Sequence, residues 1–233
     1  MLKMDEDKLN AFIKKNIAEN ERIARENNAK RKMERAQKTL SQSGLGKRFQ
    51  ERTFKNFVPN SENKQALQIA KRFAKEFPDT KGIMLVGPVG TGKTHLAAAI
   101  MNQLTYDMHD VMFGTMADII SRMKQTFGGY AHETELDILN ALTGADLLII
   151  DDMGKEKASD YASTVIYQIV NRLYEDEKPL IITTNCFPQD FETNMGERGK
   201  AIMSRLSEMC ETVIMGGADW RRKEGRQDGT YHD

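Results

Sequence analysis

Residues 87–94 read GPVGTGKT, which fits the pattern G-x-x-x-x-G-K-[ST] without a mismatch. Glycines let the backbone curl until several N–H groups face one point, where Lys93 and Thr94 add a cation and a hydroxyl. Such a loop holds nucleotide phosphates when it joins a buried strand to a helix, whose N-terminal end favours anions. The segment therefore predicts an α/β fold with an ATP site at one edge of the sheet.

Short apolar runs alternate with helical patterns on both sides of this loop. Ser61 is expected to cap the first helix of the domain, and Pro78 ends it. The expected strands are 82–86, 111–113, 147–150, 180–183 and 212–215; the expected helices are 61–77, 93–107, 116–126, 133–142, 161–175 and 199–210. Apolar strands separated by helices indicate a parallel sheet of five strands covered on both faces.

Two carboxylates follow the apolar strand 147–150, at the edge where open α/β sheets bind ligands. Asp151 is expected to hold Mg²⁺ together with Thr94, and Asp152 to orient or deprotonate an attacking water. Adjacent carboxylates repel each other unless a cation lies nearby, and Mg²⁺ supplies one. The alternative is an acidic pair that only begins a loop.

The strand 180–183 continues into Thr184 and Asn185, which brings a neutral amide to the same edge of the sheet. Asn185 is expected to hydrogen-bond the γ-phosphate or the water; the alternative is a strand-end cap.

These three motifs, in this order, resemble those of AAA+ ATPases. The flanking segments narrow the resemblance to the DnaC/DnaI-type bacterial helicase loaders, an IstB-like ATP-binding clade. The segments that show this resemblance are Arg48-Phe49, 53–57 (TFKNF), Asp151-Asp152, 203–206 (MSRL) and 218–221 (ADWR). The similarity covers roughly residues 47–222 and implies a P-loop AAA+ three-layer sandwich.

The resemblance also implies roles for single residues. Asn185 matches sensor 1, Arg205 matches the arginine finger that reaches a neighbouring subunit's nucleotide, and Arg221 matches the sensor 2 arginine. From the residues alone, Arg205 could be a surface residue of an amphipathic helix, and adjacent Arg222 could take the place of Arg221. The candidate set is Lys93, Asp152, Asn185 and Arg205 for catalysis; Gly87, Pro88, Val89, Gly90, Thr91, Gly92, Lys93, Thr94, His95 and Arg221 for the nucleotide; and Thr94 and Asp151 for the metal.

The N-terminal segment differs in charge from the rest of the chain. Residues 1–50 hold 13 Lys and Arg but 7 Asp and Glu, and the whole chain has a formal net charge of zero, so a basic arm precedes an acidic body. Leu9, Ile13 and Ile17 form a narrow apolar stripe in a segment without Gly or Pro, which predicts a helix over 1–40. Such a helix either docks on a partner or is a solvated or disordered tail.

The expected domains are therefore a helical adaptor and linker (1–45), an AAA+ domain (46–222) with a minimal lid, and a flexible tail (223–233). No Cys or His precedes His95, which excludes the zinc-binding N-terminal domain of DnaI-type proteins. A short helical adaptor is also compatible with a phage or prophage protein. No apolar run approaches the roughly 20 residues that span a bilayer, and the acidic start (Asp5 to Asp7) is unlike a signal peptide, so a cytoplasmic protein is expected.

The function implied by the resemblance is ATP-dependent loading of a hexameric replicative helicase onto single-stranded DNA, with self-assembly on ATP. Arg122 and Lys124 lie in the region that contacts DNA in related proteins, although a solvated face explains them equally well. The alternative within the clade is an IstB-like transposition helper that binds duplex DNA and a transposase. Two more function classes use a phosphate loop: a small-molecule kinase, which needs a substrate lid, and a binding module that holds ATP only as a structural ligand.

Overall fold

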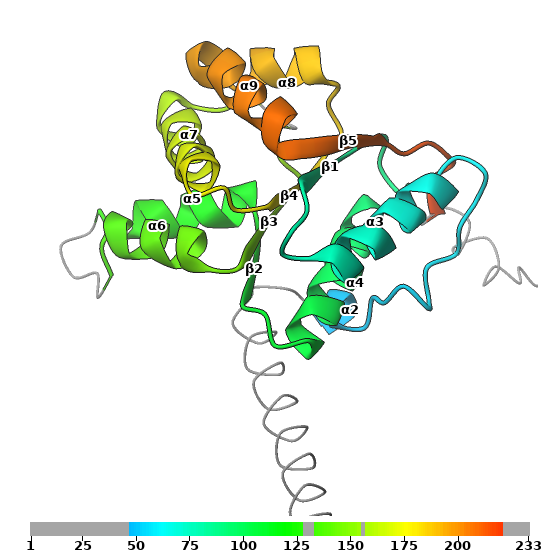
Figure 1. Ribbon diagram of the computed structural model, residues 1–233. Helices are drawn as coiled ribbons and strands as arrows, with labels where there is room; N and C mark the ends of the chain where they lie inside the picture. The colour runs from blue at the N-terminus through cyan, green and yellow to red at the C-terminus, as the bar shows by residue number, and fades with distance from the viewer. Residues whose placement is uncertain (1–46, 128–132, 155–156, 221–233) are drawn as a thin grey trace, which may run out of the picture.

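The computed structural model describes residues 47–127, 133–154 and 157–220 of the chain. Its centre is one parallel sheet with the strand order β2-β3-β4-β1-β5 (Figure 1). The strands are β1 (Gly82–Val86), β2 (Val111–Thr115), β3 (Leu147–Asp151), β4 (Leu180–Thr184) and β5 (Cys210–Ile214). The predicted five-stranded parallel sheet is confirmed.

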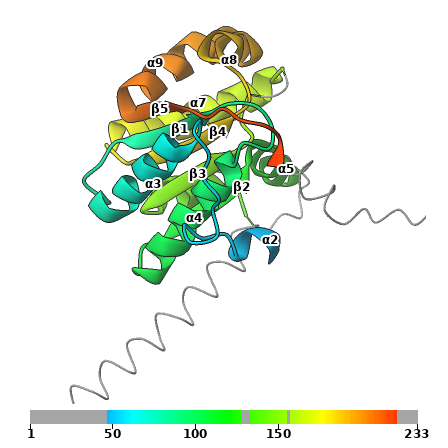
Figure 2. The same cartoon turned by 90° about the vertical axis from the view of Figure 1, so that its right-hand side faces the viewer.

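Helices cover both faces of the sheet, which makes a three-layer sandwich (Figures 1 and 2). One face carries α3 (Lys64–Glu76) and α4 (Lys93–Tyr106), with the short α2 (Lys47–Gln50) against α4. The other face carries α5 (Met116–Gln125), α6 (Glu135–Gly144), α7 (Asp160–Glu175), α8 (Pro188–Asn194) and α9 (Gly199–Met209).

The two cores follow from the alternation of side chains along each strand. Ile83 and Leu85 of β1 pack in the core with α3 and α4, whereas Met84 and Val86 pack in the core with α7 and α9. Because successive side chains of a strand point to opposite faces, a strand that is covered on both sides must be apolar throughout. All five residues of β1 are buried, which explains its unbroken apolar sequence.

Helix α3, which was predicted over 61–77, begins later, at Lys64. Asn60 forms a turn of its own, because its Oδ1 accepts the N–H groups of Glu62 and Asn63 at 2.8 Å. This turn keeps Ser61 outside the helix, so the predicted Ser61 cap is wrong. Asn63 takes the N-cap position without a capping bond from its side chain.

The remaining differences are local. Strand β2 continues to Thr115, and β5 begins at Cys210 because that residue pairs with Gly82 of β1. Helix α2, helix α8 and the 3₁₀ turn Gly196–Arg198 were not predicted from the sequence; α8 has seven residues and buries only Phe191, so its apolar periodicity is weak. The predicted adaptor (1–45) and tail (223–233) lie outside the described residues, and so do the residues after Trp220 that bear on the lid.

Candidate nucleotide-binding site

The glycine-rich loop connects β1 to α4, as its sequence predicts, and two of its glycines have left-handed backbone angles. Gly90 has φ 81° and Gly92 has φ 98°, a region that residues with a Cβ rarely adopt. Space excludes a side chain as well: a Cβ at Gly92 would lie 2.7 Å from the ring of Phe57, and one at Gly90 would lie 1.9 Å from a carboxylate oxygen of Asp219. The loop is therefore held tightly between the segments before α3 and after β5.

Lys93 lies beneath this loop with its side chain buried. Its Nζ donates to the carbonyl oxygens of Gly87 at 2.6 Å and Pro88 at 2.7 Å. These bonds hold a cation at the start of α4, where the helix N-terminus also favours an anion. The arrangement is complementary to a polyphosphate.

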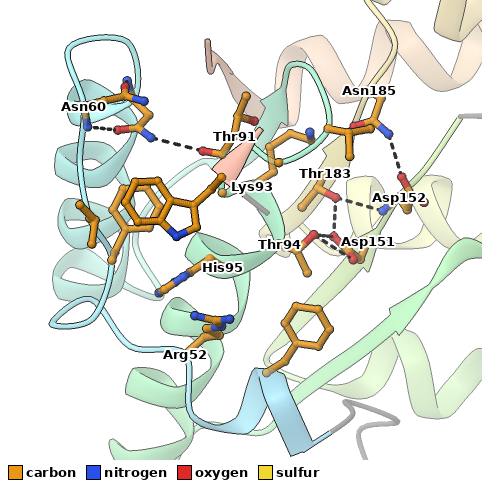
Figure 3. A pocket seen from close by; sticks show the side chains of 18 of the residues that line it. Arg52, Asn60, Thr91, Lys93, Thr94, His95, Asp151, Asp152, Thr183 and Asn185 are labelled. Atoms are coloured by element: carbon orange, nitrogen blue, oxygen red, sulfur yellow. Dashed lines mark hydrogen bonds between the residues drawn. The ribbon is translucent and has the colours of Figure 1, made fainter. Parts of the chain in front are cut away.

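Asp151 ends β3 and faces the first turn of α4 (Figure 3). The Thr94 hydroxyl donates to its Oδ1 at 2.9 Å and lies 3.2 Å from its Oδ2; the Thr183 hydroxyl donates to Oδ1 at 2.5 Å. Burial raises the pKa of the Asp151 carboxyl, and the bonds from Thr183 and Thr94 partly offset this rise. A buried carboxylate next to a hydroxyl fits the hard oxygen ligands that Mg²⁺ requires.

Asp152 and Asn185 meet at the open side of the site. The Nδ2 of Asn185 donates to Oδ1 of Asp152 at 3.1 Å (Figure 3). Asp152 is exposed, in contrast to the buried Asp151 next to it. The two neighbouring carboxylates thus occupy different environments, one suited to hold a cation and one able to reach water.

A cavity of about 330 Å³ extends from these groups to the segment before α3. Its lining includes Thr91 to His95, Asp151, Asp152 and Asn185, together with Phe57 and Trp220. Among the predicted nucleotide residues Val89 and Gly90 also line it, whereas Gly87 and Pro88 take part through their bonds to Lys93.

His95 connects α4 to the aromatic segment that precedes α3. Its Nε2 lies 3.0 Å from both the Thr53 carbonyl and Oδ1 of Asn56; since both are acceptors, Nε2 carries the proton. Burial lowers the pKa of His95, although the bond to Thr53 acts in the opposite direction. The His95 ring meets the buried Phe57 edge-on at a centroid distance of 5.1 Å. Phe57 packs in the core with α3 and α4, and the same ring lines the cavity.

Several residues of the site were not predicted from the sequence, including Thr183, Asn63 and Trp220. Thr183 contacts Asp151; Asn63 donates from Nδ2 to the Thr91 carbonyl at 3.3 Å; and the backbone N–H of Trp220 donates to the Gly90 carbonyl at 3.2 Å. Thr183 precedes Asn185 by two positions on a predicted strand, so its side chain could have been assigned to the same edge. Asn63 carries no comparable local signal, and Trp220 was noted only within the segment 218–221 that supports the resemblance.

Arg205 is not among the residues that line the cavity. It lies on α9 against α7, where its Nε donates to Oδ1 of Asn171 at 2.9 Å and its guanidinium stacks on Tyr167, 5.0 Å from the ring centre. Arg221 lies outside the described residues. On α5, Arg122 forms an ion pair with Glu133 at 2.8 Å, and DNA contact by Arg122 and Lys124 stays a prediction.

The strand order β2-β3-β4-β1-β5, with a phosphate loop after β1, a carboxylate pair after β3 and an asparagine after β4, is that of a P-loop AAA+ ATP-binding protein. The chain belongs to the family of IstB-like ATP binding proteins, whose model matches residues 12–228. Within the described residues, no helix has the length and apolar character needed to cross a membrane.

Relatives and solved structures agree with this assignment. The replicative helicase loader DnaC of Escherichia coli K12 is 35% identical over 186 residues, which cover 79% of this chain and 73% of that protein. A crystal structure of the DnaC helicase loader matches with a TM-score of 0.66 and 26% identity, covering 73% of this chain and 100% of that one. AMPPCP-bound DnaA from Aquifex aeolicus has the same fold (TM-score 0.64, 24% identity, 76% of this chain and 54% of that one). The resemblance to the DnaC/DnaI-type clade is confirmed; an origin in a phage or prophage stays a prediction.

Proposed function

We propose that this protein is an ATP-hydrolysing loader of the hexameric replicative helicase, which it helps to place on single-stranded DNA. The observation that carries the proposal is the convergence of Lys93, Asp151, Asp152 and Asn185 on one cavity in a chain whose relatives are named replicative helicase loaders. A chain that only bound ATP as a structural ligand would not need an exposed carboxylate held by an amide beside the phosphate loop.

Each group in the cavity has a role in hydrolysis. The loop and Lys93 hold the β- and γ-phosphates, while Thr94 and Asp151 would hold Mg²⁺, which neutralises charge on the phosphate oxygens. Asp152 accepts a proton from the attacking water or orients it, and Asn185 fixes that carboxylate through the 3.1 Å bond. The resemblance adds Arg221 as sensor 2, reading the nucleotide from the same subunit.

Self-assembly on ATP completes the proposed site. Arg205 does not line the cavity of its own subunit, which is compatible with a finger that serves a neighbouring subunit. The domain (46–222) then acts as an ATP-dependent assembly unit, and the adaptor (1–45) binds the helicase.

Co-purification with the replicative helicase tests this function. The full chain should retain the helicase, and a chain lacking residues 1–45 should not. A sharper test uses two double variants of the full-length chain. The first, Ile13→Gln with Ile17→Gln, removes the apolar stripe of the predicted helix. The control, Lys15→Gln with Glu19→Gln, changes the opposite face of that helix at constant net charge. Only the first pair should lose the helicase. Equal retention by all of these variants, or by none, would exclude the adaptor.

A second candidate is an IstB-like transposition helper, which the description of the matching family model favours. It predicts binding to duplex DNA and to a transposase in place of the helicase. The names of the relatives favour the loader. A transposase gene beside the gene for this protein would favour the helper, and a helicase or primase gene would favour the loader.

A further inference from the structure

Thr183, the penultimate residue of β4, forms hydrogen bonds with Asp151, which ends β3, and with Asp152, which follows it. Its hydroxyl donates to Oδ1 of Asp151 at 2.5 Å and accepts the backbone N–H of Asp152 at 3.0 Å. Its carbonyl accepts the N–H of Met153 at 2.9 Å. The Thr183 side chain is fully buried, so no water competes for these bonds.

The bonds from Thr183 support an uncommon backbone conformation. Asp152 has φ 55°, in the left-handed region that a non-glycine residue enters only when its surroundings impose it. The chain turns away from the strand at this residue, and the turn brings the Asp152 side chain to Asn185. Because Thr183 binds the N–H groups on both sides of this turn, it fixes the direction in which Asp152 points.

The Thr183 hydroxyl has one proton, and it donates this proton in its hydrogen bond to Asp151. Thr94 donates to the same carboxylate, at 2.9 Å from Oδ1. If Thr94 and Asp151 held Mg²⁺, Thr94 would serve the metal with its oxygen, whereas the buried Thr183 hydroxyl would bind only protein groups and orient the Asp151 carboxylate.

We propose that Thr183 is a positioning residue that sets the metal-holding carboxylate and the water-activating carboxylate at the same time. One buried hydroxyl does both, as donor to Asp151 and as acceptor from Asp152. The proposal rests on the proposed ATPase function, and it assigns to β4 a role beyond that of Asn185.

The test compares side chains with and without the hydroxyl. Thr183→Val keeps the shape and removes the hydroxyl, whereas Thr183→Ser keeps the hydroxyl; Thr183→Ala against Thr183→Ser makes the same comparison if the valine variant does not fold. Thr143→Val is the matched control, because Thr143 is also buried but donates only to the Leu139 carbonyl within α6. Two readouts are needed: amide hydrogen exchange at Asp152 in the nucleotide-free full chain, and the Mg²⁺ concentration that gives half-maximal ATP turnover.

We expect Thr183→Val and Thr183→Ala to raise that Mg²⁺ concentration by about 10- to 100-fold, the usual effect of removing a group that orients a metal ligand. Exchange at the Asp152 amide should accelerate about tenfold, since its acceptor is gone. Thr183→Ser and Thr143→Val should match the unmodified chain in both readouts.

The proposal is overturned if Thr183→Val keeps the Mg²⁺ requirement and the Asp152 exchange rate of the unmodified chain, or if Thr183→Ser fails as Thr183→Ala does. A failure of the ATPase function itself is distinct, because the unmodified chain would then not turn over ATP. In that case the exchange rate of the Asp152 amide still decides whether the hydroxyl positions this turn.

Discussion

Asn185 at the end of β4 donates a hydrogen bond of 3.1 Å to Asp152, which follows β3. The two residues are 33 positions apart in the sequence, but β3 and β4 are neighbours in the sheet, so their carboxyl ends meet. The amide holds one oxygen of Asp152 beside the cavity, and a carboxylate has a second oxygen with which to accept from a water molecule. Under the proposed function, this pair would separate water activation by Asp152 from metal holding by Asp151.

Asp152→Asn should bind ATP and fail to hydrolyse it. The amide can still accept the bond from Asn185, so the geometry is kept while the base is lost, and we expect turnover to fall by about 10²- to 10⁴-fold. Multiple-turnover ATPase measurements with helicase and single-stranded DNA, next to ATP-binding titrations, check this. Asp79→Asn, an exposed aspartate in the turn after α3, is the control. Normal turnover by Asp152→Asn would remove Asp152 from its role.

Lys93→Ala should lose affinity for ATP. The buried ammonium bonded to the carbonyls of Gly87 and Pro88 is part of the phosphate cradle, and losing a charge-assisted bond of about 1.5–3 kcal/mol corresponds to about 10- to 100-fold weaker binding. Lys178 offers a matched control, because its Nζ also binds backbone carbonyls, at the end of α6. Titration with a fluorescent ATP analogue should show weaker binding for Lys93→Ala alone. Equal ATP affinities for the two variants would contradict the role of Lys93 in binding the phosphates.

Asp151→Asn should make the protein more stable near neutral pH while it abolishes the use of Mg²⁺. Burial raises the pKa of the Asp151 carboxyl in the folded state, so ionising it costs folding free energy at any pH above that raised value. As the pH falls through the raised pKa toward the ordinary value near 3.9, the unmodified chain regains this stability and the difference from the variant closes. Each kcal/mol recovered raises Tm by about 2–4 °C in a chain of this size.

Thermal unfolding of both proteins between pH 4.5 and pH 8, without nucleotide, measures this difference. A variant that is less stable than the unmodified chain at pH 8 would show that the bonds from Thr94 and Thr183 outweigh the burial of the charge.

The sequence predicted the elements whose signals are local. One short segment of sequence is enough to predict each of the strands β1, β3 and β4 and the phosphate loop. Because the strands of the sheet were predicted to be parallel, the residues after these strands could be placed together at one edge of the sheet. Contacts between distant segments could not be predicted in this way. Trp220 reaches the carbonyl of Gly90, and Asn63 reaches that of Thr91, through packing that no periodicity encodes. The late start of α3 has the same kind of cause, because the side chain of Asn60 competes for backbone N–H groups that a helix would otherwise use.

Arg205→Ala should abolish ATP turnover in the assembly without weakening ATP binding by single subunits. The residue lies outside its own cavity, and Asn171 and Tyr167 hold its guanidinium on the outer layer formed by α7 and α9. A finger supplied by a neighbour contributes about 10³- to 10⁵-fold in rate. Arg172→Ala is the matched control, since Arg172 also binds an asparagine side chain, that of Asn140, and lies away from the cavity.

Mixing subunits decides whether Arg205 acts on a neighbour. Arg205→Ala subunits keep an intact cavity, and Asp152→Asn subunits keep an intact finger, so each alone is inactive while a mixture forms some complete sites. With random equimolar mixing, about one interface in four pairs an intact cavity with an intact finger. ATPase activity should therefore reappear in the mixture, to about a quarter of the unmodified level at full assembly. A mixture that assembles but stays inactive, or full turnover by Arg205→Ala alone, would show that Arg205 does not act across a subunit interface and that its stacking on Tyr167 serves only to join α9 to α7.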